Sequence, residues 1–265
     1  GLRVLRDGGS AVDAAVAIQA VLGLVEPQSS GLGGGSFLVF YDAKTGKVTA
    51  YDGREKAPSG AGPDMFLDSD GKPLPFVKVL LSGRSTGVPG AVAMLSMAQK
   101  EHGKVAWNTL FKDAEKLADD GFVVSPRLAG MINTTRAPQA SQPDAVKYFT
   151  KPDGTRYQAG DVLKNPAYAE TVRQIAAKGP AALLEGPIAQ AIVDRLHEGD
   201  LPSSITLQDL KSYKPRSAPA LCRPWKVYTV CVPNPQSSGL AVIQALRMLE
   251  HTDIGQRGPT DPVAW

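Results

Sequence analysis

Cysteine, histidine and long apolar runs are scarce in this sequence, and each scarcity excludes a class of protein. Two cysteines and three histidines occur in 265 residues. There is no Cys-x-x-Cys pair and no closely spaced pair of histidines, so the sequence predicts no metal site. The longest apolar stretch, residues 14–25, contains Gln19 and is shorter than the roughly 18 residues that a membrane-spanning helix needs. The sequence therefore predicts no membrane span.

Neither sign of charge dominates the chain. Lys plus Arg number 29 and Asp plus Glu number 26, which gives a net charge of +3. That balance does not supply the basic surface that nucleic acid or an anionic membrane requires. The chain opens at Gly1 without a basic and apolar signal region, and it stops at Trp265 after a linker-like stretch. We therefore expect both ends to be cut from a longer protein.

Glycine and proline, in contrast, are abundant. With 27 glycines and 21 prolines they make up 48 of the 265 residues, about 18% against about 12% in ordinary proteins. The excess predicts many turns and a mixed α/β (α+β) chain, with a helix-rich C-terminal half. Apolar periodicity predicts helices near residues 11–24, 91–100, 109–119, 167–178, 187–198 and 240–250, and strands near residues 37–41, 48–51, 220–222 and 227–232.

A glycine-rich segment, residues 31–35, lies between the first long predicted helix and the first predicted strand. A phosphate-binding loop requires the order strand, loop, helix, because the backbone amides and the helix dipole must face the anion. Here the order is reversed, and Ser36 stands where the dinucleotide motif requires glycine. We expect instead that the bare backbone of this segment closely approaches a substrate or a neighbouring strand.

The two cysteines allow two interpretations. If residues 225–228 form a hairpin turn, Cys222 and Cys231 lie opposite each other on antiparallel strands, at a spacing that suits a disulfide. The alternative is a pair of buried thiols. No Gly-x-Ser-x-Gly segment and no conspicuous pair of carboxylates offers a nucleophile or an acid–base pair elsewhere in the sequence.

Arg54 is a candidate binding residue because it directly follows a predicted strand. Strand ends hold side chains firmly, and a guanidinium group can bind a carboxylate through two parallel hydrogen bonds. The residues themselves also allow a simpler interpretation, in which Arg54 is a surface side chain that pairs with Glu55 or Asp52.

Six segments, in this order along the chain, resemble one family. They are similar to segments of the γ-glutamyltranspeptidases, and the similarity covers almost the whole chain. In this sequence they read GGSAVDAAVAIQAVLGLVEPQSSGLGGGSF (residues 8–37), YDGREKAP (51–58), STGVPGAVAML (85–95), DGTRYQAGDVLKNPAYAETVRQIA (153–176), ITLQDLKSY (205–213) and PNPQSSGLAVIQAL (233–246). The last segment departs from the family pattern at Gln236 and Leu240.

The resemblance implies part of an N-terminal-nucleophile hydrolase, an αββα sandwich made when one precursor cleaves itself into a large and a small subunit. It implies that residues 1–265 form a single domain, the large-subunit portion of this fold, completed by the small subunit. The N-terminal Thr of the small subunit would attack a small-molecule γ-glutamyl substrate such as glutathione, and water or an acceptor would release the acyl group. No catalytic residue, metal or organic cofactor is then expected in this chain.

The resemblance also assigns Arg54 a role, since REKAP matches the family's Arg-Glu-x-Ala-Pro. It implies that Arg54 binds the α-carboxylate of the γ-glutamyl group. The family's usual periplasmic or secreted location favours a disulfide between Cys222 and Cys231. Two alternatives remain: a related acylase of the glutaryl or cephalosporin type, and a non-catalytic homologue that lacks the nucleophile chain.

Overall fold

The computed structural model describes residues 1–134, 137–233, 237–258 and 260–264. The chain forms two compact units, one of residues 1–35 and 53–214, the other of residues 36–52 and 215–265. Both contain helices and strands, which confirms the predicted mixed α/β class. The prediction of a single domain completed by a second chain stays a prediction.

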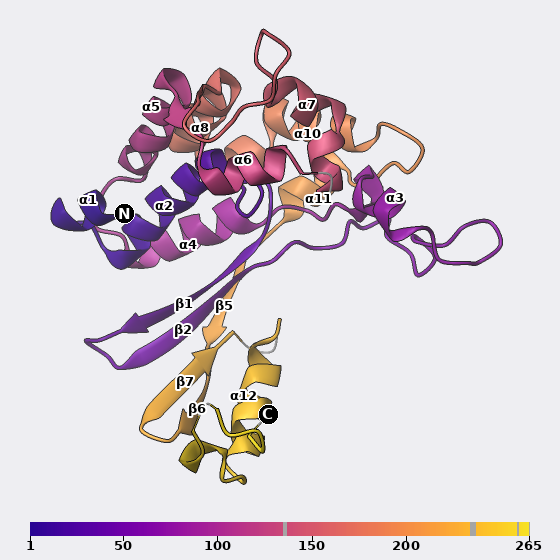
Figure 1. Cartoon of the computed structure of the whole chain (residues 1–265). Helices are drawn as coiled ribbons and strands as arrows, with labels where there is room; N and C mark the ends of the chain where they lie inside the picture. Colours follow the sequence, from indigo (N-terminus) through magenta and orange to yellow (C-terminus); the bar gives the residue numbers. More distant parts are fainter. Residues whose placement is uncertain (135–136, 234–236, 259, 265) are drawn as a thin grey trace. The chain divides into compact units, whose positions relative to one another are not determined.

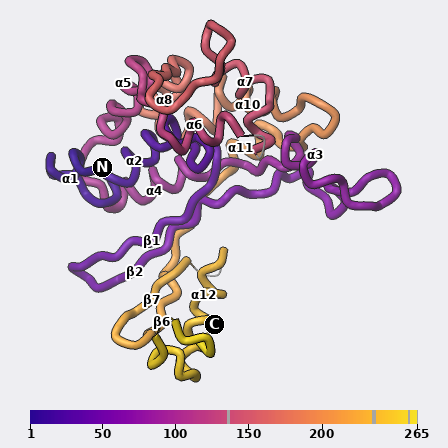
Figure 2. Tube along the Cα trace, viewed as in Figure 1, coloured from indigo at the N-terminus to yellow at the C-terminus, as the bar shows by residue number. Residues whose placement is uncertain are grey.

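The first unit is mostly helical, and α2 packs beside α4 within it (Figure 1). Its helices are α1 (Leu2–Arg6), α2 (Ala11–Val25), α3 (Phe76–Leu80), α4 (Ala91–His102), α5 (Lys112–Asp120), α6 (Pro126–Ile132), α7 (Pro143–Tyr148), α8 (Pro166–Lys178), α9 (Ala181–Leu184), α10 (Gly186–Leu196) and α11 (Leu207–Ser212). Two short strands, β3 (Phe122–Val123) and β4 (Val162–Leu163), pair with each other. Figure 2 shows the chain between β2 and α3 as a long irregular loop.

The N-terminus of α2 is fixed by a buried carboxylate. Ser10 and Asp13 form a reciprocal capping box, in which each side chain accepts a hydrogen bond from the other's backbone N–H. Asp13 is fully buried, and it also accepts hydrogen bonds from the backbone N–H of Lys104 and from the Gln99 amide. One carboxylate thus ties the start of α2 to the loop that follows α4.

A compact apolar cluster in the first unit joins α4, α10 and α11. Its buried members are Val88, Ala93, Ala189, Val193, Ile205, Leu210 and Tyr213. Burying each of the larger side chains contributes roughly 1.5–3 kcal/mol to the free energy of unfolding. The cluster contains Val88 and Tyr213, which both contact the segment around Arg54.

The described part of the second unit contains two small sheets, the helix α12 and a 3₁₀ turn (Ile254–Gln256). Strands β1 (Ser36–Asp42), β2 (Lys47–Gly53) and β5 (Arg216–Pro219) form a sheet in the order β1-β2-β5, and β5 runs antiparallel to β2. Strands β6 (Leu221–Trp225) and β7 (Tyr228–Val232) form a hairpin beside α12 (Gly239–Leu249). The strands expected near residues 37–41 and 48–51 are present as neighbours in one sheet, and of the two interpretations of the cysteines the structure has the hairpin.

Several elements differ from the prediction. The helix expected over residues 109–119 is a 3₁₀ turn, Trp107–Phe111, followed by α5. The short helices α6, α7, α9 and α11 were not predicted, because four to seven residues are too few to display a helical period. Residues 234–236, which belong to the segment resembling the family near the C-terminus, lie outside the described residues. Across the part of the chain that is described, no helix has the length and apolar character needed to cross a membrane.

Candidate substrate-binding site

Arg54 lies directly after β2, at the edge of a pocket in the first unit. The pocket has a volume of about 430 Å³ and is lined by Gly33, Arg54, Glu55, Ser85, Thr86 and Gly87. The side chain of Arg54 is 65% exposed, and its Nε lies 3.3 Å from Oε2 of Glu55. Of the two acidic partners that the sequence offered, the structure pairs Glu55 with Arg54, whereas Asp52 forms an ion pair with Arg216.

The backbone on both sides of Arg54 is held by hydrogen bonds. The Tyr213 hydroxyl donates to the carbonyl of Arg54 over 2.8 Å. Lys56 and Val88 exchange two backbone hydrogen bonds, of 2.8 and 3.3 Å, as an isolated antiparallel bridge. Gly90 leaves the space that the Tyr213 hydroxyl occupies, since a methyl group there would overlap with it. These contacts fix the position from which the Arg54 side chain extends.

Glu55 packs directly against two glycines from different segments. A methyl group at Gly35 would lie 2.5 Å from Oε2 of Glu55, and one at Gly87 would lie 2.7 Å from its Cβ. Both distances are far below the 3.5–4.0 Å of a normal carbon contact. The carbonyl of Gly34 also accepts hydrogen bonds from the N–H groups of Gly90 and Ala91, each 3.0 Å long. Gly34 and Gly35 thus approach other groups closely, but these groups are Glu55 and the start of α4 rather than the substrate or neighbouring strand that was expected, and a methyl group at Gly31 or Gly33 would meet nothing within 4 Å.

The segment ITLQDLKSY forms the support beneath this site. Thr206 and Asp209 form a second reciprocal capping box at the start of α11. Asp209 also accepts a hydrogen bond of 2.9 Å from the backbone N–H of Ser59, five residues after Arg54. Burial acts to raise the pKa of Asp209, but the hydrogen bonds from Ser59 and Thr206 outweigh it and lower the pKa to about 2. The carboxylate is therefore ionised at neutral pH.

The site suits an anionic group. A guanidinium presents five N–H donors in a planar fork that matches the geometry of a carboxylate. Glu55 contacts Nε and so orients the Arg54 side chain, while the neighbouring pocket has the volume for a small amino-acid-like ligand.

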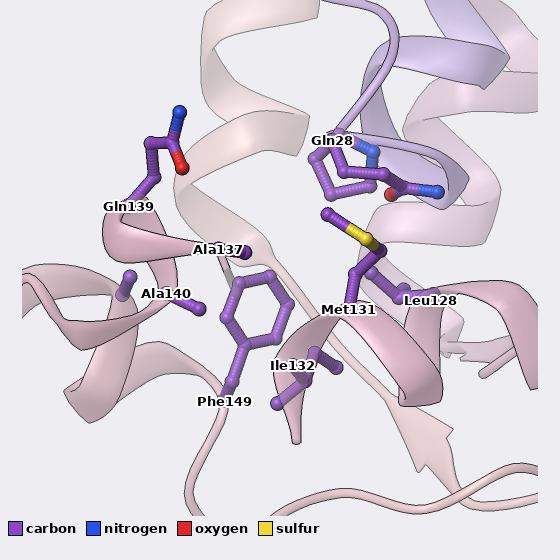
Figure 3. Close-up of a pocket in the computed structure, with 10 residues that line it drawn as sticks. Gln28, Leu128, Met131, Ile132, Ala137, Gln139, Ala140 and Phe149 are labelled. Carbon is purple, nitrogen blue, oxygen red and sulfur yellow. The ribbon is translucent and has the colours of Figure 1, made fainter. Parts of the chain in front are cut away.

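A second hollow in the first unit has a different character (Figure 3). Its volume is about 270 Å³, and its described lining includes Leu128, Met131, Ile132 and Phe149, together with the amides of Gln28 and Gln139. Figure 3 shows the Phe149 ring beside Ile132, with the Gln139 amide directed away from them. The lining side chains that the structure describes are apolar or uncharged, unlike those of the Arg54 pocket.

The described residues contain no group of three or more His, Cys, Asp or Glu side chains that could hold a metal ion. His197 contacts the carbonyl of Ile205 through Nε2 at 2.8 Å, a structural contact at the end of α10. The predicted absence of a metal and of a cofactor stays a prediction.

The two cysteines belong to the second unit. The β6–β7 register pairs Cys222 with Cys231, and their Sγ atoms form a disulfide with a Cα–Cα distance of 4.1 Å. Lys226 takes a positive φ of 52° in the turn, which allows the short connection between the strands. Oxidation of this pair in solution stays a prediction.

Sequence reasoning proposed Arg54 as a binding residue, which stays a prediction, and it did not indicate most of the residues that surround Arg54 in the structure. Tyr213, Gly87 and Thr86 each belong to a segment that resembles the family, yet their residue types alone do not indicate a site. They meet Arg54 and Glu55 only because the chain folds. The sequence signal that could have linked these residues to Arg54 is that all of them lie in segments that resemble the same family.

The chain is similar to known proteins over almost its whole length. The sequence profile described as gamma-glutamyltranspeptidase matches residues 1–265. The glutathione hydrolase proenzyme of Bacillus subtilis (strain 168) is 36% identical over 257 residues, which covers 97% of this chain and 43% of that protein. The corresponding proenzyme of Escherichia coli (strain K12) is 35% identical over 259 residues, covering 97% and 44%. The chain thus spans less than half the length of these relatives.

Solved structures show the same relationship. The γ-glutamyltranspeptidase of Helicobacter pylori superposes with a TM-score of 0.91 at 33% identity, covering 98% of this chain and 74% of that one. A cephalosporin acylase from Bacillus halodurans, at 24% identity and a TM-score of 0.75, shares the fold over 95% of this chain and 46% of its own. The fold is therefore that of the N-terminal-nucleophile hydrolases. By the profile match and these identities, the chain belongs to the γ-glutamyltranspeptidase family.

Proposed function

We propose that this chain is the large-subunit portion of a γ-glutamyltranspeptidase that transfers or hydrolyses the γ-glutamyl group of glutathione and related amides. The single observation that carries the proposal is the pocket at Arg54, where segments resembling the family hold a guanidinium beside a space for a small ligand. The printed names of the relatives, glutathione hydrolase proenzymes, support the substrate class.

In the proposed reaction Arg54 binds the α-carboxylate of the γ-glutamyl group. This contact places the γ-carbonyl before the N-terminal Thr of a small subunit cut from the same precursor. The Thr hydroxyl attacks the carbonyl, its own α-amine accepts the proton, and an acyl-enzyme forms as the amine product leaves. Water or an acceptor amine then attacks the ester and regenerates the Thr. The chain itself supplies binding and orientation, and the reaction uses neither metal nor cofactor.

The proposal includes self-cleavage of a precursor, a heterodimer of large and small subunits, and a periplasmic or secreted location. The word proenzyme in the relatives' names supports the processing step. The disulfide between Cys222 and Cys231 supports an oxidising compartment, because structural disulfides are rare in the cytosol.

The test uses the full-length protein that contains this chain. We expect mass spectrometry to show two chains after purification, and we expect the pair to release p-nitroaniline from γ-glutamyl-p-nitroanilide. Glutaryl-p-nitroanilide, which lacks only the α-amino group, serves as the comparison substrate. Faster turnover of the glutaryl compound would favour an acylase, and absence of turnover of both would favour a non-catalytic homologue.

Residues 1–265 produced alone give a second measurement. Because the proposed nucleophile belongs to the small subunit, this chain by itself should release no p-nitroaniline. Turnover by the isolated chain would contradict the proposed division of labour between two chains.

A further inference from the structure

Thr86 shares the pocket with Arg54, but neither the sequence nor the proposed reaction gives it a role. It lies between a 3₁₀ turn (Gly83–Ser85) and the bridge that Val88 forms with Lys56. Thr86 is partly exposed, and its hydroxyl makes no hydrogen bond to any residue that the structure describes. A pocket-lining hydroxyl in this state is available to a ligand.

The segment that carries Thr86 is held from both ends. On the N-terminal side, the backbone N–H of Arg84 donates to the carbonyl of Leu201, and the Arg84 guanidinium donates to the carbonyl of Met65. Gly83 packs so closely against the Leu196 carbonyl that no side chain fits between them. The turn that carries Thr86 is therefore held in place by hydrogen bonds and close packing.

On the C-terminal side the segment joins the support of Arg54 itself. Val88 exchanges two backbone hydrogen bonds with Lys56, and Gly87 lies against the Cβ of Glu55. The backbone positions of Thr86 and Arg54 are consequently fixed relative to each other by the same short set of contacts. Such preorganisation is typical of two groups that bind one ligand.

The number of acceptor positions on a carboxylate indicates which atom of the ligand the Thr86 hydroxyl contacts. A carboxylate offers about four acceptor positions, and a guanidinium fork occupies two of them. A hydroxyl can donate to a third position. Glu55, the acidic side chain of the described lining, has its Oε2 beside Nε of Arg54 and is engaged with the guanidinium rather than with the ligand.

We infer that Thr86 is a further substrate-contacting residue, whose hydroxyl donates a hydrogen bond to the carboxylate that Arg54 binds. This inference rests on the proposed function, because that function supplies the γ-glutamyl α-carboxylate. It makes Thr86 a determinant of specificity for substrates with a free carboxylate at this position.

The experiment compares Thr86→Val with Thr86→Ser in the full-length, processed protein. Valine keeps the shape of threonine and removes the hydroxyl, whereas serine keeps the hydroxyl. For γ-glutamyl-p-nitroanilide we expect Thr86→Val to raise KM roughly tenfold with little change in kcat, and Thr86→Ser to stay within about twofold of the wild type.

A second substrate separates contact from structure. In the α-carboxamide analogue of γ-glutamyl-p-nitroanilide the carboxylate is replaced by a neutral amide. The amide oxygen still accepts a hydrogen bond but carries no charge, so if Thr86 contacts the carboxylate, Thr86→Val should raise the KM of this analogue clearly less than that of γ-glutamyl-p-nitroanilide. An equal rise in KM for both substrates, or no rise for either, would overturn the inference. If the wild-type protein turns over neither substrate, the proposed function is wrong and this inference is wrong with it. If the wild-type protein is active but Thr86→Val has an unchanged KM for γ-glutamyl-p-nitroanilide, only this inference is wrong.

Discussion

At the scale of single residues, the candidate site depends on two glycines, because a larger residue at either position would collide with Glu55. Gly35 and Gly87 come from segments far apart in the sequence, yet both lie against Glu55. Their packing fixes Glu55, and Glu55 in turn contacts the Arg54 guanidinium at 3.3 Å. A change that adds a methyl group here should act on substrate binding through Arg54.

We predict that Gly35→Ala lowers kcat/KM for γ-glutamyl-p-nitroanilide roughly 10- to 100-fold, since a displacement near 1 Å in a binding group has effects of that size. The added methyl would lie 2.5 Å from Oε2 and 2.7 Å from the backbone N of Glu55, so Glu55 must move. Gly31→Ala is the matched control, because a methyl group there meets nothing within 4 Å. Equal kinetics for the two variants would contradict this role of Gly35.

The residue scale also shows what the sequence could and could not predict. Arg54 and Glu55 are neighbours in the chain, so their ion pair was among the options before the structure was known. The hydrogen bond from Tyr213 to Arg54 spans 159 positions, and no local pattern encodes it. The sequence therefore indicated the charged group of the site but not the residues that position it.

At the scale of elements, short helices position the site and depend on their caps. Helix α11 has six residues, which are too few for a stable isolated helix. Its capping box and the hydrogen bond from the Ser59 N–H to Asp209 stabilise it in the folded chain. The long helices α4, α8 and α10 were predicted to within a few residues, because apolar residues recur along each at spacings of three and four; α8 and α10 bury one face, whereas the first two turns of α4 are buried on nearly all sides. The short ones were missed because tertiary contacts, rather than periodicity, hold them in place.

The cap of α11 gives a pH prediction. The folded-state pKa of Asp209, about 2, lies below the ordinary value of 3.8. Its ionised form therefore contributes stability above pH 4, and that contribution is lost as the pH falls from about 4 to about 2. We expect Asp209→Asn to lower Tm at pH 7, with a difference from the wild type that shrinks between pH 4 and pH 2. Thermal unfolding monitored by circular dichroism measures it, with the exposed Asp64→Asn as control; a constant Tm difference across this range would contradict the assignment.

The β6–β7 hairpin gives a second prediction at this scale. The disulfide joins residues nine positions apart, and closing a loop of that length in the unfolded chain stabilises the fold by about 2–3 kcal/mol. We expect no free thiol in the non-reduced, denatured protein, and a lower Tm after reduction. The double variant Cys222→Ser/Cys231→Ser should show the same lower Tm and no response to a reductant. Two titratable thiols in protein purified without reductant would contradict the disulfide.

At the scale of the whole molecule, the pocket at Arg54 is supported by four segments of the first unit that lie far apart in the sequence. The segments at residues 31–35, 54–58, 83–90 and 205–213 meet around Arg54 and Thr86. The mixed α/β class followed from composition and periodicity, whereas the division into two units depends on long-range pairing such as that of β2 with β5. In the proposed function this chain binds the substrate and another chain supplies the nucleophile, so the proposal depends on the claim that Arg54 binds the substrate carboxylate.

That claim is tested most directly by the KM of Arg54→Ala in the full-length, processed protein, measured with γ-glutamyl-p-nitroanilide and with its α-carboxamide analogue. Loss of one partner of a charge pair that is desolvated on binding costs roughly 2–5 kcal/mol, so we expect KM for the carboxylate substrate to rise about 30-fold or more. The carboxamide analogue, which offers no charge to Arg54, should bind the variant and the wild type about equally well. An unchanged KM for γ-glutamyl-p-nitroanilide in Arg54→Ala would contradict the account.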